Sequence, residues 1–144
     1  LAFCSMGAPM RLHDWALRLE SLIDDRLHTR FSFGQHDCCM WACDVVLAVT
    51  GRDPVADLRG TYSTEQEAAD VMEAGGGLEA MAEARFGPEI KPLAAAAGDV
   101  GIIDTDLGPA LVACGGATWL AASGFGVVAV DQSQVLRAWR CEVI

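Results

Sequence analysis

A reactive thiol is the first chemistry that this sequence suggests. In the run FSFGQHDCCMWACDVV, Cys38 directly follows Asp37, a residue type that caps helix N-termini, and precedes an apolar stretch that predicts a helix over residues 38–50. The unpaired N–H groups and the positive dipole end of a helix stabilise an anion. We therefore expect a lowered pKa for the Cys38 thiol, which makes it a candidate nucleophile.

A nucleophilic thiol needs a base, and the sequence offers few. The chain has three histidines, His13, His28 and His36, and all of them precede Cys38. His36 is a weak candidate base, because its loop would have to fold back over the thiol. A solvated loop histidine is the simpler interpretation.

Metal binding by the cysteines is the alternative chemistry. Cys38 and Cys39 are adjacent and point in different directions on a helix, which does not match the usual spacing of zinc ligands, although Cys114 could join them from a facing strand. We expect reduced thiols, no metal and no cofactor. Cys43 and Cys141 are expected to pack in the core as small apolar residues.

Composition limits the class of protein. The chain has 144 residues, of which 52% are hydrophobic and 21% charged, with a formal net charge of -10. This predicts one folded domain over residues 11–144, preceded by an uncertain extension over residues 1–10 that is too short to span a membrane. The acidic balance argues against nucleic acid as a partner, and no membrane insertion is predicted. It suits a basic partner surface or simple solubility.

The pattern along the chain predicts an α+β fold, with N-terminal helices packed on a small antiparallel C-terminal sheet. Helices are predicted over residues 11–28, 38–50, 64–74 and 78–86, the third with a capping box formed by Ser63, Thr64 and Glu67. Beyond residue 97 the β-prone runs VGIID, PALVACG, GVVAVD and LRAWRCEVI predict a meander.

Two short motifs carry a resemblance to a known family. Phe33, Gly34, Asp37 and Cys38 are followed much later by the run Gly98, Asp99 and Val100. This pattern resembles the NlpC-type, papain-like cell-wall peptidases. Further matches cover roughly residues 11–141 and resemble the branch carried by tailed phages and prophages: Trp15, Gly51–Asp53, Arg59–Tyr62 and Ala138–Arg140.

The chain departs from this family at the base. The resemblance implies a histidine at the start of the strand after Gly-Asp, and here that position falls near Pro109 or Ala110. Alternation along the strand puts Ala110, Val112 and Cys114 on one face. We expect that face to look toward the cysteine helix, so that small apolar groups line a vestigial catalytic cleft.

The resemblance therefore implies three functions. The first is a structural component of the tail tip of a long-tailed phage or prophage, made in the host cytoplasm and located in the virion, with hub and fibre proteins as partners. The alternative is an active cysteine amidase or endopeptidase that cleaves peptidoglycan during DNA entry, with Cys38 as nucleophile and a base from His36 or another subunit. The third is a host cytoplasmic protein that binds a small ligand in the cleft.

Overall fold

The computed structural model describes residues 10–142 and is an α+β structure, as predicted. Apart from Met10, the extension expected over residues 1–10 lies outside the described residues. The helices are α2 (Trp15–Arg26), α3 (Cys38–Thr50), α4 (Glu65–Ala74) and α5 (Leu78–Arg85). The strands are β1 (Glu89–Ile90), β2 (Val100–Thr105), β3 (Gly108–Cys114), β4 (Trp119–Ser123), β5 (Gly126–Val130) and β6 (Arg137–Trp139), with 3₁₀ turns η1 (Pro92–Ala94) and η2 (Gln132–Gln134).

The described strands form one antiparallel sheet with the order β1-β6-β2-β3-β4-β5. Strands β2 to β5 follow one another as the predicted meander. The prediction was wrong for the last strand, because β6 returns across the sheet and lies between β1 and β2. It also missed β4, whose residues directly follow the loop at Gly115 and Gly116.

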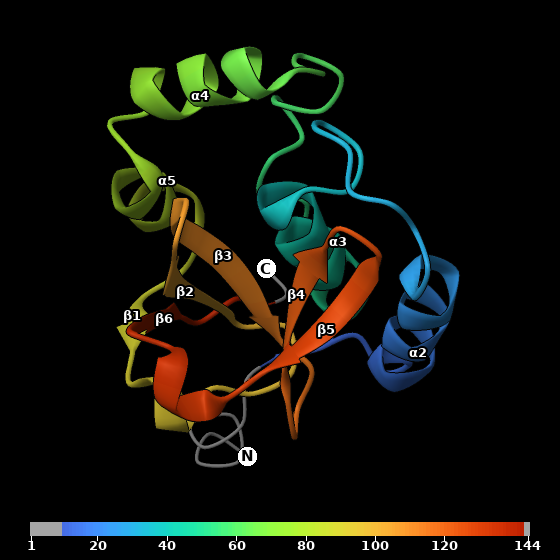
Figure 1. Ribbon diagram of the computed structural model, residues 1–144. Helices are drawn as coiled ribbons and strands as arrows, with labels where there is room; N and C mark the ends of the chain where they lie inside the picture. Colours follow the sequence, from blue (N-terminus) through green and yellow to red (C-terminus); the bar gives the residue numbers. More distant parts are fainter. Residues whose placement is uncertain (1–9, 143–144) are drawn as a thin grey trace.

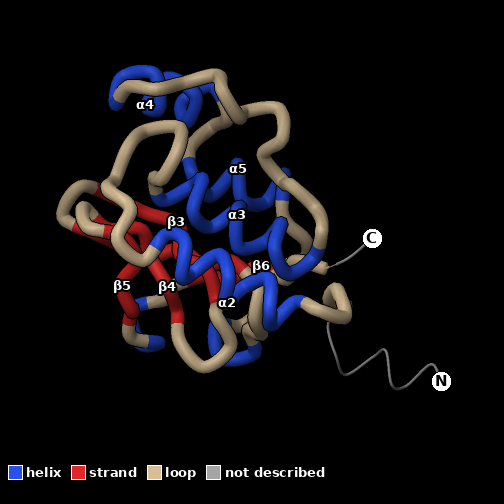
Figure 2. The backbone as a smooth tube through the Cα atoms, turned by 90° about the vertical axis from the view of Figure 1, so that its right-hand side faces the viewer, coloured by secondary structure: helices blue, strands red, loops and turns tan. Residues whose placement is uncertain are grey.

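The helices form a layer against one face of this sheet. Helix α3 contacts β3 and β4, and α2 contacts both α3 and β5. Figure 2 shows α3 between α2 and α5, with β3, β4 and β5 to the left of α3 and α2 in this view. Helix α4 stands apart from the sheet, above α3 and α5 in Figure 1.

Helix α3 is the centre of the main core because its sequence is apolar on nearly every side. Met40, Trp41 and Cys43 have no exposed surface. Cys141 from the C-terminal segment lies in the same cluster, so the predicted core positions of Cys43 and Cys141 are confirmed. The helix ends at Gly51, whose φ of 77° is the left-handed conformation that glycine adopts readily. Within residues 10–142, no helix is long and apolar enough to cross a bilayer.

Candidate functional site

The start of α3 is fixed by the carboxylate of Asp37. One oxygen accepts the backbone N–H of Met40 at 2.7 Å. The other accepts the Gly34 N–H at 2.8 Å and the Tyr62 hydroxyl at 2.7 Å. The predicted helix cap is therefore confirmed. Because both oxygens already have partners, Asp37 organises the helix start and is not a free acid or base.

A tight turn brings the loop before α3 close to Tyr62. Ser32 and His36 pair across this turn, and Gly34 between them has a φ of 86°. A Cβ atom at Gly34 would overlap the Tyr62 carbonyl oxygen. The glycine is therefore required both by the turn and by the close approach of the neighbouring chain.

Cys38 lies in the first turn of α3, opposite β3, as predicted. The residue as a whole is partly exposed, and its thiol lies beside the backbone of Leu111. Burial raises the pKa of Cys38 to about 11, and the negative charge of Asp37 adds to this shift. The expected lowering of the pKa was therefore wrong, because desolvation outweighs the backbone hydrogen bonds that favour the thiolate.

His36 is buried, so the interpretation of a solvated loop histidine was wrong. Only 1% of its surface is exposed. Its Nε2 donates to the carbonyl oxygen of Gly126 at 2.9 Å, and its ring meets Trp41 edge to face. Since a carbonyl can only accept, Nε2 carries the ring proton, and Nδ1 is buried with no partner within the described structure. This arrangement connects the loop before α3 to β5, and His36 is not among the residues that line the pocket beside Cys38.

A small apolar pocket adjoins the thiol. Its volume is about 70 Å³. We call it the Cys38 pocket, and its lining residues are Phe31, Phe33, Asp37, Cys38, Cys39, Leu58, Tyr62, Ala68, Val71, Met72 and Met81. No histidine belongs to this lining, and His13 and His28 are exposed at the two ends of α2.

The residues of β3 face the opposite way from our expectation. Leu111 and Ala113 pack in the core with α3. Ala110, Val112 and Cys114 belong to the second core, on the far face of the sheet, with Ile103, Trp119 and Val135. The vestigial cleft predicted from these three residues was therefore wrong. Alternation predicted which residues share a face, but not which face looks toward α3.

The comparison with known proteins identifies the family. A domain of unknown function, DUF6950, matches residues 10–141. The chain belongs to the DUF6950 family. No curated protein and no solved structure matches it.

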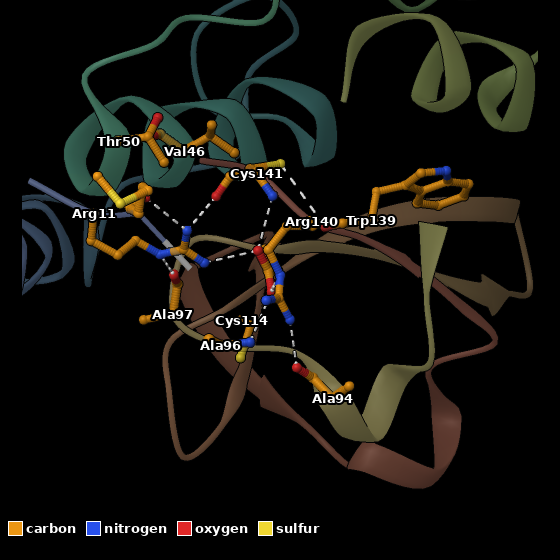
Figure 3. A network of polar contacts seen from close by, with 12 residues as sticks. Arg11, Val46, Thr50, Ala94, Ala96, Ala97, Cys114, Trp139, Arg140 and Cys141 are labelled. Atoms are coloured by element: carbon orange, nitrogen blue, oxygen red, sulfur yellow. Dashed lines mark hydrogen bonds and ion pairs between the residues drawn. The ribbon is translucent and has the colours of Figure 1, made fainter. Parts of the chain in front are cut away.

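The Gly98–Asp99 pair of this DUF6950 chain has a structural role. Asp99 is fully buried and lies 2.9 Å from the Arg11 guanidinium. It also accepts the backbone N–H groups of Cys141 at 2.9 Å and Ala96 at 2.8 Å. Arg140 Nε lies 3.1 Å from the second oxygen, at ion-pair distance but without hydrogen-bond alignment. Figure 3 shows Arg11, from the start of the described chain, close to Arg140 and Cys141, from its end.

The geometry does not favour a metal centre in the DUF6950 domain. Cys114 lies on the far face of the sheet and cannot join Cys38 and Cys39. Across residues 10–142, no three His, Cys, Asp or Glu side chains converge to hold a metal ion. Cys38, Cys39, Cys43, Cys114 and Cys141 are free thiols.

Sequence reasoning identified Asp37 and Cys38 but missed the residues that enclose them. The sequence indicates Tyr62 only as the last residue of the run Arg59–Tyr62, and it places Met72 and Met81 only within predicted helices. The amphipathic pattern of α4 was the available signal, since Ala68, Val71 and Met72 share one face. That pattern indicates that α4 covers something, but not that it covers the thiol.

Proposed function

We propose that this chain is a non-hydrolytic structural component of the tail tip of a long-tailed phage or prophage, built on a degenerate NlpC-type, papain-like fold. The observation that carries the proposal is a thiol in the position of a nucleophile with no base beside it. Cys38 begins a central helix packed on an antiparallel sheet, which supports the family resemblance.

The missing base argues against hydrolysis. A cysteine peptidase needs an imidazole to take the thiol proton. The β3 side chains that face α3 are Leu111 and Ala113, and neither accepts a proton. His36 bonds to Gly126 and does not line the Cys38 pocket, and the raised pKa of Cys38 keeps its thiol protonated at neutral pH.

A fold that has lost this chemistry retains a shaped surface. The buried residues around α3 form one hydrophobic core. The cap of α3 makes its hydrogen bonds, and Gly34 allows the tight turn beside the neighbouring chain. Such a domain can serve as a rigid interaction module among hub and fibre proteins, and this role requires no catalytic group.

The test is whether particles contain the chain. We expect mass spectrometry of purified particles, induced from a lysogen that carries this gene, to detect the chain together with tail proteins after the tails are separated from capsids. Its presence in the lysate and absence from purified particles would contradict the tail-tip role.

A parallel assay addresses the enzymatic alternative. Purified sacculi incubated with the chain should release no more soluble peptide than with Cys38→Ala. Release that disappears in Cys38→Ala would establish a cysteine hydrolase and would mean that a base reaches Cys38 by another route.

A further inference from the structure

The Cys38 pocket is suited to an apolar group. The polar atoms of its lining are largely occupied, since the carboxylate of Asp37 accepts three hydrogen bonds, one of them from Tyr62. A polar ligand would therefore find few free partners there. The remaining lining is aliphatic, aromatic or sulfur-bearing.

The size of the pocket restricts the occupant further. An apolar cavity of roughly 150 Å³ holds benzene. About 70 Å³ is available here, which fits a small aliphatic side chain such as valine or leucine better than an aromatic ring. Of the lining residues Phe31 is exposed and six others are partly exposed, so the pocket is reachable from the surface.

The helix that covers the pocket is strongly acidic on its exposed surface. Helix α4 supplies Ala68, Val71 and Met72 to the lining, and none of its residues is buried. The whole segment 60–84 contains no lysine or arginine. Four carboxylates of α4 form no ion pair within the described part of the chain: Glu65, Glu67, Asp70 and Glu73.

We propose that the Cys38 pocket docks an aliphatic side chain of a partner protein, carried on a segment rich in lysine or arginine. The apolar lining favours the aliphatic side chain. The unpaired negative charges of α4 favour the lysine or arginine residues on either side of it. The inference rests on the proposed function in one respect, because a pocket beside a thiol that does not hydrolyse peptides can hold a peptide side chain without cleaving the peptide.

The test measures binding of short capped peptides by calorimetry. We expect a peptide with one leucine between lysines to bind and to protect Cys38 from alkylation. Replacing the leucine with alanine should weaken binding about tenfold or more. Glutamate in place of the lysines should abolish binding, because like charges would face each other.

Matched variants assign the binding to this site. Ala68→Leu fills the pocket and should block the peptide, whereas Ala69→Leu, at an exposed position of the same helix, should not. Glu65→Gln/Glu73→Gln should lower affinity by about threefold per carboxylate. The control Glu20→Gln/Asp24→Asn removes the same charge from exposed positions of α2 and should leave affinity unchanged.

Several outcomes would overturn the docking site. These are equal binding of the glutamate-flanked peptide, full binding by a correctly folded Ala68→Leu protein, or no binding of the leucine peptide to the parent chain at millimolar concentration. Dimerisation that Ala68→Leu abolishes would assign the pocket to a second copy instead. Absence from phage particles would refute the tail-tip role and leave this binding result standing, so the two failures are distinguishable.

Discussion

At the scale of single residues, the neighbours of Cys38 decide its chemistry. The position at a helix N-terminus favours the thiolate, but burial and the nearby Asp37 carboxylate favour the neutral thiol. Burial has the largest effect on this pKa, and the pKa is raised. A cysteine in the position of a nucleophile is therefore not by itself a nucleophile, because activation also needs a cation or an imidazole beside it.

This balance predicts the pH dependence of Cys38 alkylation. Because burial raises the pKa to about 11, the reactive thiolate is scarce at neutral pH, and we expect the iodoacetamide rate to rise about tenfold per pH unit up to roughly pH 10. Peptide mass spectrometry resolves the rate at this residue. The same chain in urea is the control, and its rate should level off near the ordinary thiol pKa of 9.0.

The raised pKa also makes the stability of the fold depend on pH, and this limits the highest pH at which alkylation of the folded protein can be measured. A thiol whose pKa is higher in the folded state than in the unfolded chain contributes its stability below pH 9, and loses it as the pH rises toward 11. Burial also raises the pKa of Cys141, to about 12.

A plateau of the Cys38 alkylation rate at or below pH 8 in the folded protein would contradict the raised pKa and would indicate an activated thiolate.

At the scale of elements, the helices could be predicted because their ends are marked by local chemistry. Asp37 and Thr64 accept hydrogen bonds from backbone N–H groups in the first turns of α3 and α4, and Gly51 ends α3 in the left-handed conformation. Glu67 completes the predicted capping box through the backbone N–H of Ser63. These contacts join residues within four positions of each other, so the sequence contains them directly.

The sheet was harder to predict because its pairing is not local. Nothing in the run LRAWRCEVI indicates that β6 pairs with β2 and not with β5. Alternation grouped Ala110 with Val112 and Cys114 correctly, but the choice of face depends on how α3 docks. The burial of His36 depends in the same way on β5, a strand far along the chain, so no local pattern revealed it.

Gly126 connects these elements. Its carbonyl oxygen accepts the His36 Nε2–H, its φ is 143°, and a Cβ atom there would overlap the Leu27 carbonyl. We expect Gly126→Ala to destabilise the fold, by about 1–3 kcal/mol from backbone strain and a comparable amount from the overlap. Urea denaturation monitored by tryptophan fluorescence would measure it.

Gly124 is the matched control for that substitution. It lies in the same hairpin, and a Cβ atom there would meet nothing within 4 Å. Gly124→Ala should therefore leave the urea midpoint nearly unchanged. Equal midpoints for the two variants would mean that β5 moves away from α2 without cost, and that the connection through His36 is not rigid.

At the scale of the whole molecule, the first and last described segments are joined through one buried carboxylate, that of Asp99. Asp99 stands at the entry to β2, where the backbone also receives the Cys114 N–H at 2.8 Å. Arg11, from the segment before α2, donates to Asp99 and to the backbone carbonyls of Ala97 and Cys141. The segments before α2 and after β6 therefore meet at a single residue, which gives the Asp99 of the Gly98–Asp99 pair a structural role.

We expect Asp99→Asn to destabilise the whole domain, because it leaves the buried guanidinium of Arg11 without its anion. Removing one partner of a buried ion pair typically costs about 3–5 kcal/mol.

Asp57→Asn is the control, since Asp57 is an exposed partner of Arg85 and its loss should hardly change the melting temperature. Thermal melts compare the two, and hydrogen exchange should show lost protection both at the start of α2 and in β6. If Asp99→Asn has the same melting temperature as Asp57→Asn, then Arg11 is held by the backbone carbonyls alone, and the two ends of the described chain are joined by hydrogen bonds instead of by charge.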